Sequence, residues 1–381
     1  MTAELEVRIL SSLSLVTEEA WNALVDVDRD SPFLDYRWLS ALETCGCVGP
    51  ESGWIPSHFV VYDGDELVAA APAYVKDNSE GEFVYDFAWA DLYRRVGQDY
   101  YPKIVFAVPF TPAQGTRFLV KEGIDKGSIV SAMLQLGDKL AEEIEASSLH
   151  VLFPTKEEAD LLAERETMLR YGVQFHWTNA SYANFEDFLK SLPSKKRTQL
   201  RRERKQLAID GVALREVPAN ELEANAEAMF RFYANTIRKF PWQKRYLNMR
   251  FFKHIAKAFP EHLSWIFAER AGEPIAGAFN VKSKRSLFGR YWGSTEELPF
   301  LHFNVCYYDG VDRSIGEGRL TFEPGAGGEH KRVRGFDPTI TYSAHRIYDP
   351  RLRPIFEDYL KRERESIERF VASGGEGDEP E

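Results

Sequence analysis

The side chains best able to do chemistry are concentrated in residues 301–346 of this 381-residue chain. The stretch reads LHFNVCYYDGVDRSIGEGRLTFEPGAGGEHKRVRGFDPTITYSAHR and contains three histidines, several acids and a basic cluster. Burying so many unpaired charges would cost free energy, so an ordinary core segment does not have this composition. Polar groups gathered after a short apolar strand instead indicate a site whose pKa values are adjusted by neighbouring charges. We therefore expect residues 301–346 to form the wall of an active site.

Within this stretch, the segment EPGAGGEHKRVR at residues 323–334 has the residue types that acyl transfer to an amine requires. Glu323 or His330 can take the proton of the attacking ammonium, while Lys331 and Arg334 can hold a phosphate or carboxylate group. The glycines allow the backbone to approach a ligand closely. A solvated loop held together by Glu–Arg pairs is the alternative interpretation.

Further side chains are candidates for contacting the substrate. Arg290 lies in an apolar stretch and needs an acidic partner, for which the loop at Glu323 is suited. Tyr307 and Tyr308 are neighbours on a predicted helix, so they diverge around its axis and at most one should face the site. Core packing explains Trp292 equally well, and a lone histidine is more often structural than catalytic. The predicted substrate-binding residues are Arg290, Trp292, His302, Asn304, Tyr308, Glu329, Tyr342 and His345.

A second cationic feature is the run SKKRTQLRRERK at residues 194–205. Leu200, Leu207 and Ala208 give it a narrow apolar edge, which predicts a helix with one buried edge and a broad cationic face. Such a face should attract a polyanion in a salt-dependent way. A solvated helix balanced by nearby acids is the alternative. The predicted donor- or phosphate-binding residues are Lys195, Lys196, Arg197, Arg201, Arg202 and Arg334.

Length and composition set the bounds for these sites. The chain exceeds what one core usually supports, so we expect domains at 1–178 and 179–372 and a disordered tail at 373–381. The net charge of −11 argues against a general nucleic-acid coat protein. We see no export signal and no membrane-inserting segment, which predicts a cytoplasmic protein. The three cysteines give no disulfide framework, and no residue set has metal-ligand spacing, so no metal is expected.

The elements that must position these residues occur in the same order in both halves. Hairpins are predicted at 57–76 and 264–282, and they align without a gap, with Ser57 on Ser264 and Val68 on Ile275. Each is followed by a third strand, a helix and a further strand. We also expect a strand at 171–177 to complete the sheet of the first half. The sequence thus predicts an α/β protein of two tandem domains, with mixed, mostly antiparallel sheets flanked by helices.

This order of elements resembles the GNAT acyltransferase fold, and its doubling resembles the Fem-type peptidoglycan aminoacyltransferases. The blocks GEFVYDFAWADLYRRVG, YYPKIVFAVPFTPAQGTRFL, GRYWGS, LHFNVCYYDGVD and EPGAGGEHKRVRGFDPTITYSAH are similar to signature blocks of the Fem-like GNAT family. The resemblance implies that a lysine late in the chain contacts the donor. Lys331 matches it, so the predicted catalytic residues are Glu323, His330 and Lys331.

The chain departs from the family pattern at three positions. Asn304 stands where Glu is usual, Gly327 where Gln is usual, and Arg346 where an aromatic residue is usual. A catalytic acid therefore cannot be transferred to position 304. In the first half, we regard Asp86, Trp89, Tyr100 and Tyr101 as candidates for lining a cleft between the domains.

The predicted function follows from these residues and the resemblance together. Neither third strand is followed by the Gly-rich pyrophosphate loop of acetyl-CoA enzymes, and the resemblance implies an aminoacyl-tRNA donor instead. We predict an acyltransferase that moves an aminoacyl group from tRNA, bound at the basic helix, to a small amine-type acceptor. The attack would be direct, within a ternary complex, because no G-x-S-x-G motif is present and Cys306 lies within a helical pattern. No tightly bound cofactor is expected. The alternatives are an acyl-CoA-dependent N-acetyltransferase and a non-catalytic module that binds peptides or cell-wall fragments.

Overall fold

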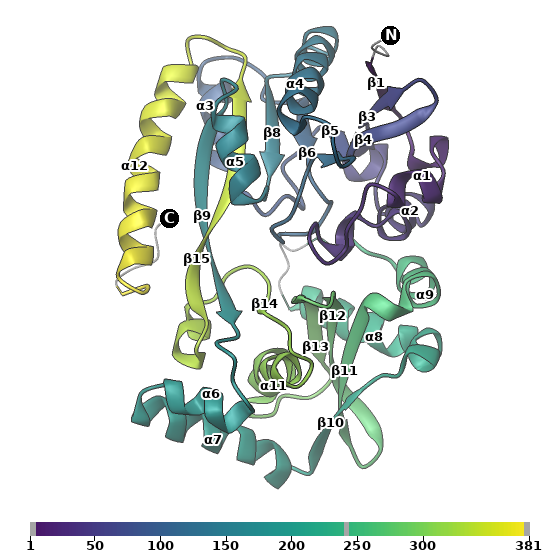
Figure 1. The fold of residues 1–381 in the computed structure, drawn as a ribbon. Helices are drawn as coiled ribbons and strands as arrows, with labels where there is room; N and C mark the ends of the chain where they lie inside the picture. The colour runs from purple at the N-terminus through teal and green to yellow at the C-terminus, as the bar shows by residue number, and fades with distance from the viewer. Residues whose placement is uncertain (1–4, 240–243, 377–381) are drawn as a thin grey trace. The chain divides into compact units, whose positions relative to one another are not determined.

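The computed structural model describes residues 5–239 and 244–376, and the chain divides into two compact units (Figure 1). The first unit comprises Met1–Val173 and Ile340–Glu381, and the second comprises Gln174–Thr339. Residues 340–372, which the sequence analysis placed in the second domain, therefore group with the first. Residues 373–376 form a turn after the last helix, and the rest of the expected tail lies outside the described residues.

The first unit contains two sheets with helices packed against them. One sheet has the strand order β1-β3-β4-β7, and the other contains neighbouring strands in the order β2-β5-β6-β8-β15. The strands are β1 (Leu5–Leu10), β2 (Trp54–Pro56), β3 (His58–Asp63), β4 (Glu66–Ala71), β5 (Ala73–Lys76), β6 (Lys103–Phe106), β7 (Leu119–Val120), β8 (Ser148–Leu152) and β15 (Asp337–Ile347). The helices are α1 (Glu18–Asn22), α2 (Tyr36–Thr44), α3 (Phe87–Arg95), α4 (Lys126–Glu143), α5 (Lys156–Ala163) and α12 (Arg353–Ala372).

The second unit is built on strands in the order β10-β11-β12-β13-β14, with the end of β9 next to β14. These strands are β9 (Met168–Thr178), β10 (Val212–Glu216), β11 (Leu263–Arg270), β12 (Glu273–Lys282), β13 (Ser286–Ser294) and β14 (Thr321–Glu323). The helices are α6 (Phe185–Ser191), α7 (Ser194–Ile209), α8 (Leu222–Arg238), α9 (Met249–Ala258), α10 (Leu301–Phe303) and α11 (Asp309–Gly316), with a π-helical turn at Asn304–Tyr308.

The structure confirms the predicted fold class and the repeated order of elements. Each unit has an antiparallel meander, then a helix, then a strand that pairs in parallel: β8 with β6 in the first unit and β14 with β13 in the second. A β-bulge occurs at Val61/Tyr62 in the first hairpin and at Ala268/Glu269 in the second. These positions correspond when Ser57 is aligned with Ser264, so the repeat extends to an irregularity of the backbone.

The strand predicted at 171–177 is present, and it extends further than expected. It is β9, and its last residues, Trp177 and Thr178, pair with Phe322 and Thr321 of β14 in the second unit. β9 is also next to β15 in the strand order, so the prediction that it joins the sheet of the first half is confirmed, and the structure differs from it only in that the strand continues into the second unit. Its length explains the difference, because β9 has 11 residues, twice a usual strand.

Helix α8 covers β12 and β13, and thereby fixes the strand that carries Trp292. Its buried face is formed by residues at helical spacing, including Ala226, Met229 and Phe232. The backbone of Gly293 meets this helix so closely that a Cβ atom would lie 1.8 Å from the carbonyl oxygen of Phe232. The hydroxyl of Thr236 donates a hydrogen bond to the carbonyl of Trp292 at 2.5 Å. Glycine is thus required where the helix rests on the strand.

We predict that Gly293→Ala lowers the free energy of unfolding by about 1–3 kcal/mol, because the added methyl group overpacks this contact. Gly316→Ala is the matched control, since no atom lies within 4 Å of the added Cβ at the end of α11. The control should be neutral or stabilising by up to about 1 kcal/mol. Urea unfolding measures both, and wild-type stability of Gly293→Ala would contradict the close contact between α8 and β13.

Candidate active site

The glycine-rich loop after β14 is held in place by Lys331. Gly325 and Gly328 have φ values of 92° and 96°, which side-chain-bearing residues rarely adopt. The loop leads into a 3₁₀ helix at Glu329–Arg334, which places the Lys331 ammonium back under the loop. Its Nζ donates to the carbonyls of Gly325 at 2.5 Å and Ala326 at 3.3 Å. Lys331 is only 2% exposed, so its positive charge lies beneath the loop.

The adjacent helix reaches this loop through two tyrosines. The Tyr307 hydroxyl and His330 Nε2 are 2.8 Å apart. The Tyr308 hydroxyl donates to Glu203 and accepts a hydrogen bond from Arg334 Nε at 3.0 Å. The two side chains thus diverge as predicted, and which of them faces a ligand stays a prediction. Both lie in the π-helical turn, whose wider spacing changes the direction of successive side chains, and their partners come from different segments.

A buried ion pair joins the loop to the basic helix α7. Arg334 Nη2 lies 3.0 Å from Glu203 Oε2, and the two side chains are 4% and 1% exposed. The remaining nitrogens of Arg334 donate to the Tyr308 hydroxyl and, at 2.7 Å, to the carbonyl of His330. Gln199 donates to the other Glu203 oxygen at 2.8 Å. Each charged group is therefore hydrogen-bonded, which a buried pair needs in order to offset its desolvation.

Glu203 is not among the residues predicted from the sequence, where it only interrupts the basic run. Leu200, Glu203 and Leu207 are all buried and recur at helical spacing, so the acid lies on the apolar edge of α7. This spacing was the signal that could have identified it. Ala208, which was expected on the same edge, is exposed.

Two histidines near the loop, His302 and His330, are neutral near pH 7. Burial, reinforced by the charges of His330, Lys331 and Arg334, lowers the pKa of His302 to about 3. Burial and the charges of Lys331 and Arg334 also lower the pKa of His330. Because His330 is exposed and uncharged, its imidazole can accept a proton. His302 stacks on Trp292 with ring centroids 4.3 Å apart.

Glu323 faces a different set of groups. Its Oε2 lies 3.9 Å from His176 Nε2, and burial followed by the charge of Lys331 lowers the pKa of His176 to about 4. Burial lowers the pKa of Arg290, and Glu323 is among the charges that oppose this shift, in agreement with the expected acidic partner. Glu323 therefore interacts with His176 and Arg290 rather than with His330.

The other predicted site residues are distributed as follows. Asn304 is buried, and its amide donates to the carbonyls of Glu203 and Phe300, each at 3.0 Å, which is a structural role. The side chain of Glu329 lies outside the described part of the structure. Tyr342 and His345 belong to the first unit, where Tyr342 packs on Tyr171. The structure therefore does not bring these two residues into the cluster around His330.

The predicted cations of α7 differ in their engagement. Arg197 donates to the carbonyls of Leu192 and Lys190, at 3.2 and 3.4 Å. Arg201 pairs with Glu186 at 2.7 Å on the surface. Lys195, Lys196 and Arg202 form no ion pair within 4.0 Å with any acid among the described residues. The basic helix therefore retains uncompensated positive charge.

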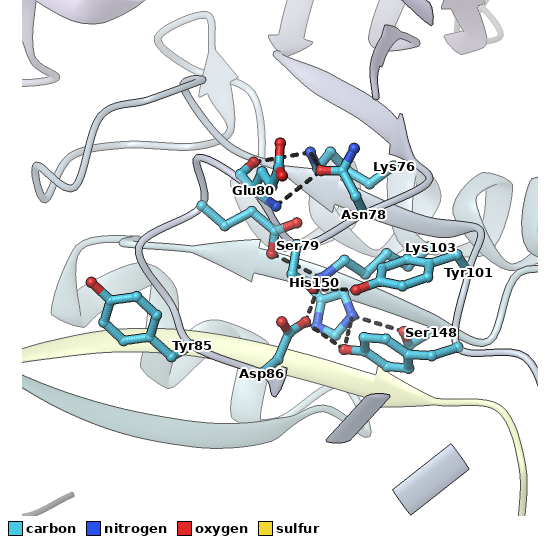
Figure 2. A network of polar contacts seen from close by, with 12 residues as sticks. Lys76, Asn78, Ser79, Glu80, Tyr85, Asp86, Tyr101, Lys103, Ser148 and His150 are labelled. Carbon is cyan, nitrogen blue, oxygen red and sulfur yellow. Dashed lines mark hydrogen bonds and ion pairs between the residues drawn. The ribbon is translucent and has the colours of Figure 1, made fainter. Parts of the chain in front are cut away.

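The first unit contains a separate, enclosed polar network, which Figure 2 shows. Lys103 on β6 is fully buried, and its ammonium donates to Glu82 at 2.9 Å, to Ser79 at 3.2 Å and to Asp86. The Tyr100 hydroxyl donates to Asp86 at 2.6 Å. Asp86, Trp89 and Tyr100 are thus core residues of the first unit rather than the lining of a cleft.

Two histidines continue this network. His150 Nδ1 and His345 Nδ1 are 2.6 Å apart, and Ser148 lies 2.7 Å from His150 Nε2. Burial lowers the pKa of both imidazoles well below the usual value, so both are neutral. One ring nitrogen of this pair must donate and the other accept, which fixes complementary tautomers. The predicted substrate-binding residue His345 is thus a partner of His150.

Burial changes the protonation of two other members of the network. It raises the pKa of Glu82 to about 7, against the opposing charge of Lys103. It also lowers the pKa of Lys76, which lies opposite Lys103 on β5, to about 7. Lys76 donates to Asn78 and to the Glu80 carbonyl, both at 3.1 Å, and so holds the loop that carries Glu82.

Comparisons with known proteins add the following findings. A family model described as peptidoglycan biosynthesis/recognition (FemAB-like) matches residues 12–376. Among solved structures, the chain is similar to FemX, with 12% identity over 90% of this chain and 98% of that chain and a TM-score of 0.53. It is also similar to the C-terminal domain of a putative lysylphosphatidylglycerol synthetase from Agrobacterium fabrum (10% identity, 77% and 85% coverage, TM-score 0.50).

A third similar structure is L-PGS from Bacillus licheniformis, with 10% identity, 89% and 98% coverage and a TM-score of 0.50. At these identities the likeness shows a shared fold alone. No curated protein matches the sequence. Among residues 5–239 and 244–376 we find no helix that combines the length and apolar character needed to cross a membrane.

We predict that Glu203→Gln lowers the free energy of unfolding by about 3–5 kcal/mol, because it leaves the Arg334 guanidinium buried without a counter-charge. Arg201→Gln on the same helix is the control, since its pair with Glu186 is exposed, and it should leave stability unchanged within error. Chemical denaturation measures both. Equal effects of the two substitutions would show that the buried pair does not join α7 to the loop.

We also predict a pH-dependent effect of Glu82→Gln. The folded protein retains the Glu82 proton up to about pH 7, whereas the unfolded chain loses it near pH 4.5. The contribution of Glu82 to the free energy of unfolding is therefore complete below pH 4.5 and is lost as the pH rises through 7. Gln does not titrate, so the stability of the variant relative to wild type should rise between pH 4.5 and 7.5, by on the order of 1–3 kcal/mol. A constant difference across this range, in denaturation curves, would contradict the raised pKa.

Proposed function

Because the chain belongs to the FemAB-like family of peptidoglycan biosynthesis/recognition proteins, we propose that it is an acyltransferase that moves an aminoacyl group from aminoacyl-tRNA to an amine-type acceptor. One observation carries this proposal. The exposed, neutral His330 lies in a loop that a buried ion pair ties to the basic helix α7. A proton acceptor and a cationic surface suited to RNA phosphates are thereby held in one unit.

The proposed reaction is direct attack of the acceptor amine on the aminoacyl ester. The acceptor ammonium gives one proton to His330, and its nitrogen then bonds to the ester carbonyl carbon. The bond from that carbon to the tRNA ribose oxygen breaks, and this oxygen takes the second proton from the nitrogen. The products are an amide and a free ribose hydroxyl, and one proton is released in total.

The neighbouring residues have distinct roles in this proposal. Lys331 is a positioning residue, because its buried ammonium holds the glycine-rich loop through the carbonyls of Gly325 and Ala326. Glu323 faces His176 and Arg290, so we favour His330 over Glu323 as the base. Burial raises the pKa of Cys306, which keeps it as a thiol and favours direct attack over a cysteine intermediate.

The cationic face of α7 supports an RNA donor. Lys195, Lys196, Arg202 and Lys205 are not ion-paired with acids of the described chain, although the protein carries a net charge of −11. Positive charge left uncompensated in an acidic protein favours a local polyanion contact. An acyl-CoA-dependent transferase would need the same proton acceptor but not a broad cationic face, and a non-catalytic binding module would need no proton acceptor.

We predict that Lys195→Glu/Lys205→Glu weakens retention of bulk aminoacyl-tRNA in filter binding by at least 10-fold and makes its salt dependence less steep, because phosphate contacts are lost. Lys139→Glu/Lys257→Glu, on α4 and α9, carries the same charge change and should bind like wild type. Free CoA should not compete. Equal binding by both double variants would exclude α7 as the RNA contact, and competition by CoA would favour the acyl-CoA alternative.

We predict that His330→Gln lowers the rate of aminoacyl transfer by about 10²–10⁴-fold while tRNA binding persists, because only proton transfer is removed. His254→Gln, an exposed histidine on α9, is the control and should retain wild-type activity. Single-turnover transfer and urea unfolding of the same preparations separate catalysis from folding. An active His330→Gln enzyme would show that another group is the base.

A further inference from the structure

A cluster of rings lies beside the loop of the second unit and is not used by the proposed chemistry. We call Trp292, Phe300, His302 and Phe303 the ring platform. Trp292 and His302 stack with centroids 4.3 Å apart at 28°, and Phe300 and Phe303 stack at 6.4 Å and 29°. His302 and Phe303 join the two pairs at 5.6 Å. All four side chains are half-buried, so solvent reaches the platform.

The platform is bordered by cations. The Arg334 guanidinium lies 3.4 Å from the Phe303 centroid, on the side of the buried ion pair. The Arg202 guanidinium lies 6.0 Å from the Phe300 centroid and extends from the exposed face of α7. Arg202 is exposed and forms no ion pair with an acid in the described ranges. Rings and free positive charge thus adjoin, which is the combination found in single-stranded nucleic-acid sites.

The backbone at Phe300 reinforces this arrangement. Phe300 has a φ of 63°, in the left-handed region that a bulky residue seldom adopts. At this position, directly before α10, its ring lies 6.0 Å from the Arg202 guanidinium and 6.4 Å from the Phe303 ring. Strained backbone of this kind persists where the surrounding structure imposes it and is common at ligand sites.

We propose that the ring platform binds the unpaired 3′-terminal base of an RNA strand by stacking, with the preceding phosphates along Arg202 and the cationic face of α7. The near-parallel ring pairs offer the offset geometry that a further stacked ring continues. His302 is uncharged, so it presents a ring rather than a cation. This inference rests on the proposed RNA donor, because it assigns the 3′ end of that RNA to the ring platform.

Phe300→Gly is the most informative variant. It removes one ring and replaces a strained residue by the one that adopts a positive φ freely, so the fold should be retained. Trp292→Phe is the conservative second variant, because it keeps a ring against His302. Phe87→Ala, an aromatic residue of the first unit that is 60% exposed, is the control.

The probes are a short fluorescent single-stranded RNA ending in CCA and the same RNA with an abasic 3′-terminal ribose, measured by anisotropy at fixed salt. Wild type should bind the intact RNA about 10–100-fold more tightly than the abasic RNA. Phe300→Gly should lose most of this difference without a change in the salt dependence. Trp292→Phe should keep most of it, and Phe87→Ala should keep all of it.

Three outcomes would overturn the inference. They are wild-type discrimination between the two RNAs by Phe300→Gly, equal binding of both RNAs by wild type, and displacement of the RNA by free CoA. The test is separable from the proposed function. RNA binding that depends on the 3′-terminal nucleobase, without aminoacyl transfer, would refute the proposed function but not the proposed stacking site. Undiminished transfer by Phe300→Gly would refute the stacking site but not the proposed function.

Discussion

The second unit depends on one interaction, the buried ion pair between Glu203 and Arg334. Glu203 comes from a helix that otherwise presents cations to solvent. Arg334 comes from the segment that also carries His330 and Lys331. Neither charge could remain in the interior alone, so the helix and the loop are held in register by the cost of separating them. Tyr308 and Gln199 saturate the remaining hydrogen-bonding capacity of Glu203. The same ion pair therefore fixes the cationic face of α7 and the proton acceptor His330 relative to each other.

The two units share a backbone plan but use polar groups differently. In the first, Lys103, Glu82 and Asp86 form a closed network in the interior, together with a neutral histidine pair. In the second, a comparable concentration of polar groups opens to solvent at His330. Burial lowers histidine pKa values in both units, but among the residues that the structure describes only His330 combines a lowered pKa with an exposed side chain. This contrast is why we assign the chemistry to the second unit.

Much of the fold could be predicted from the sequence, because it rests on local patterns. The two hairpins, the helix at α4 and the cationic helix α7 follow from periodicity and turn residues, and the structure confirms them. Contacts across long separations could not be predicted in the same way. The pairing of β9 with β14 and the grouping of His345 with His150 depend on tertiary packing that no periodicity encodes. Glu203 lies between these cases, since its spacing from Leu200 was visible but its partner, 131 residues away, was not.

We propose that this chain makes an amide at the expense of an aminoacyl-tRNA ester. The most direct measurement follows radiolabelled amino acid on bulk charged tRNA, incubated with the purified protein and a mixture of small amine-bearing metabolites. Base treatment cleaves the ester but spares an amide. We predict that label moves into a base-stable product, in an amount that depends on protein and on acceptor. Label that stays base-labile, together with base-stable product from acyl-CoA under the same conditions, would contradict it.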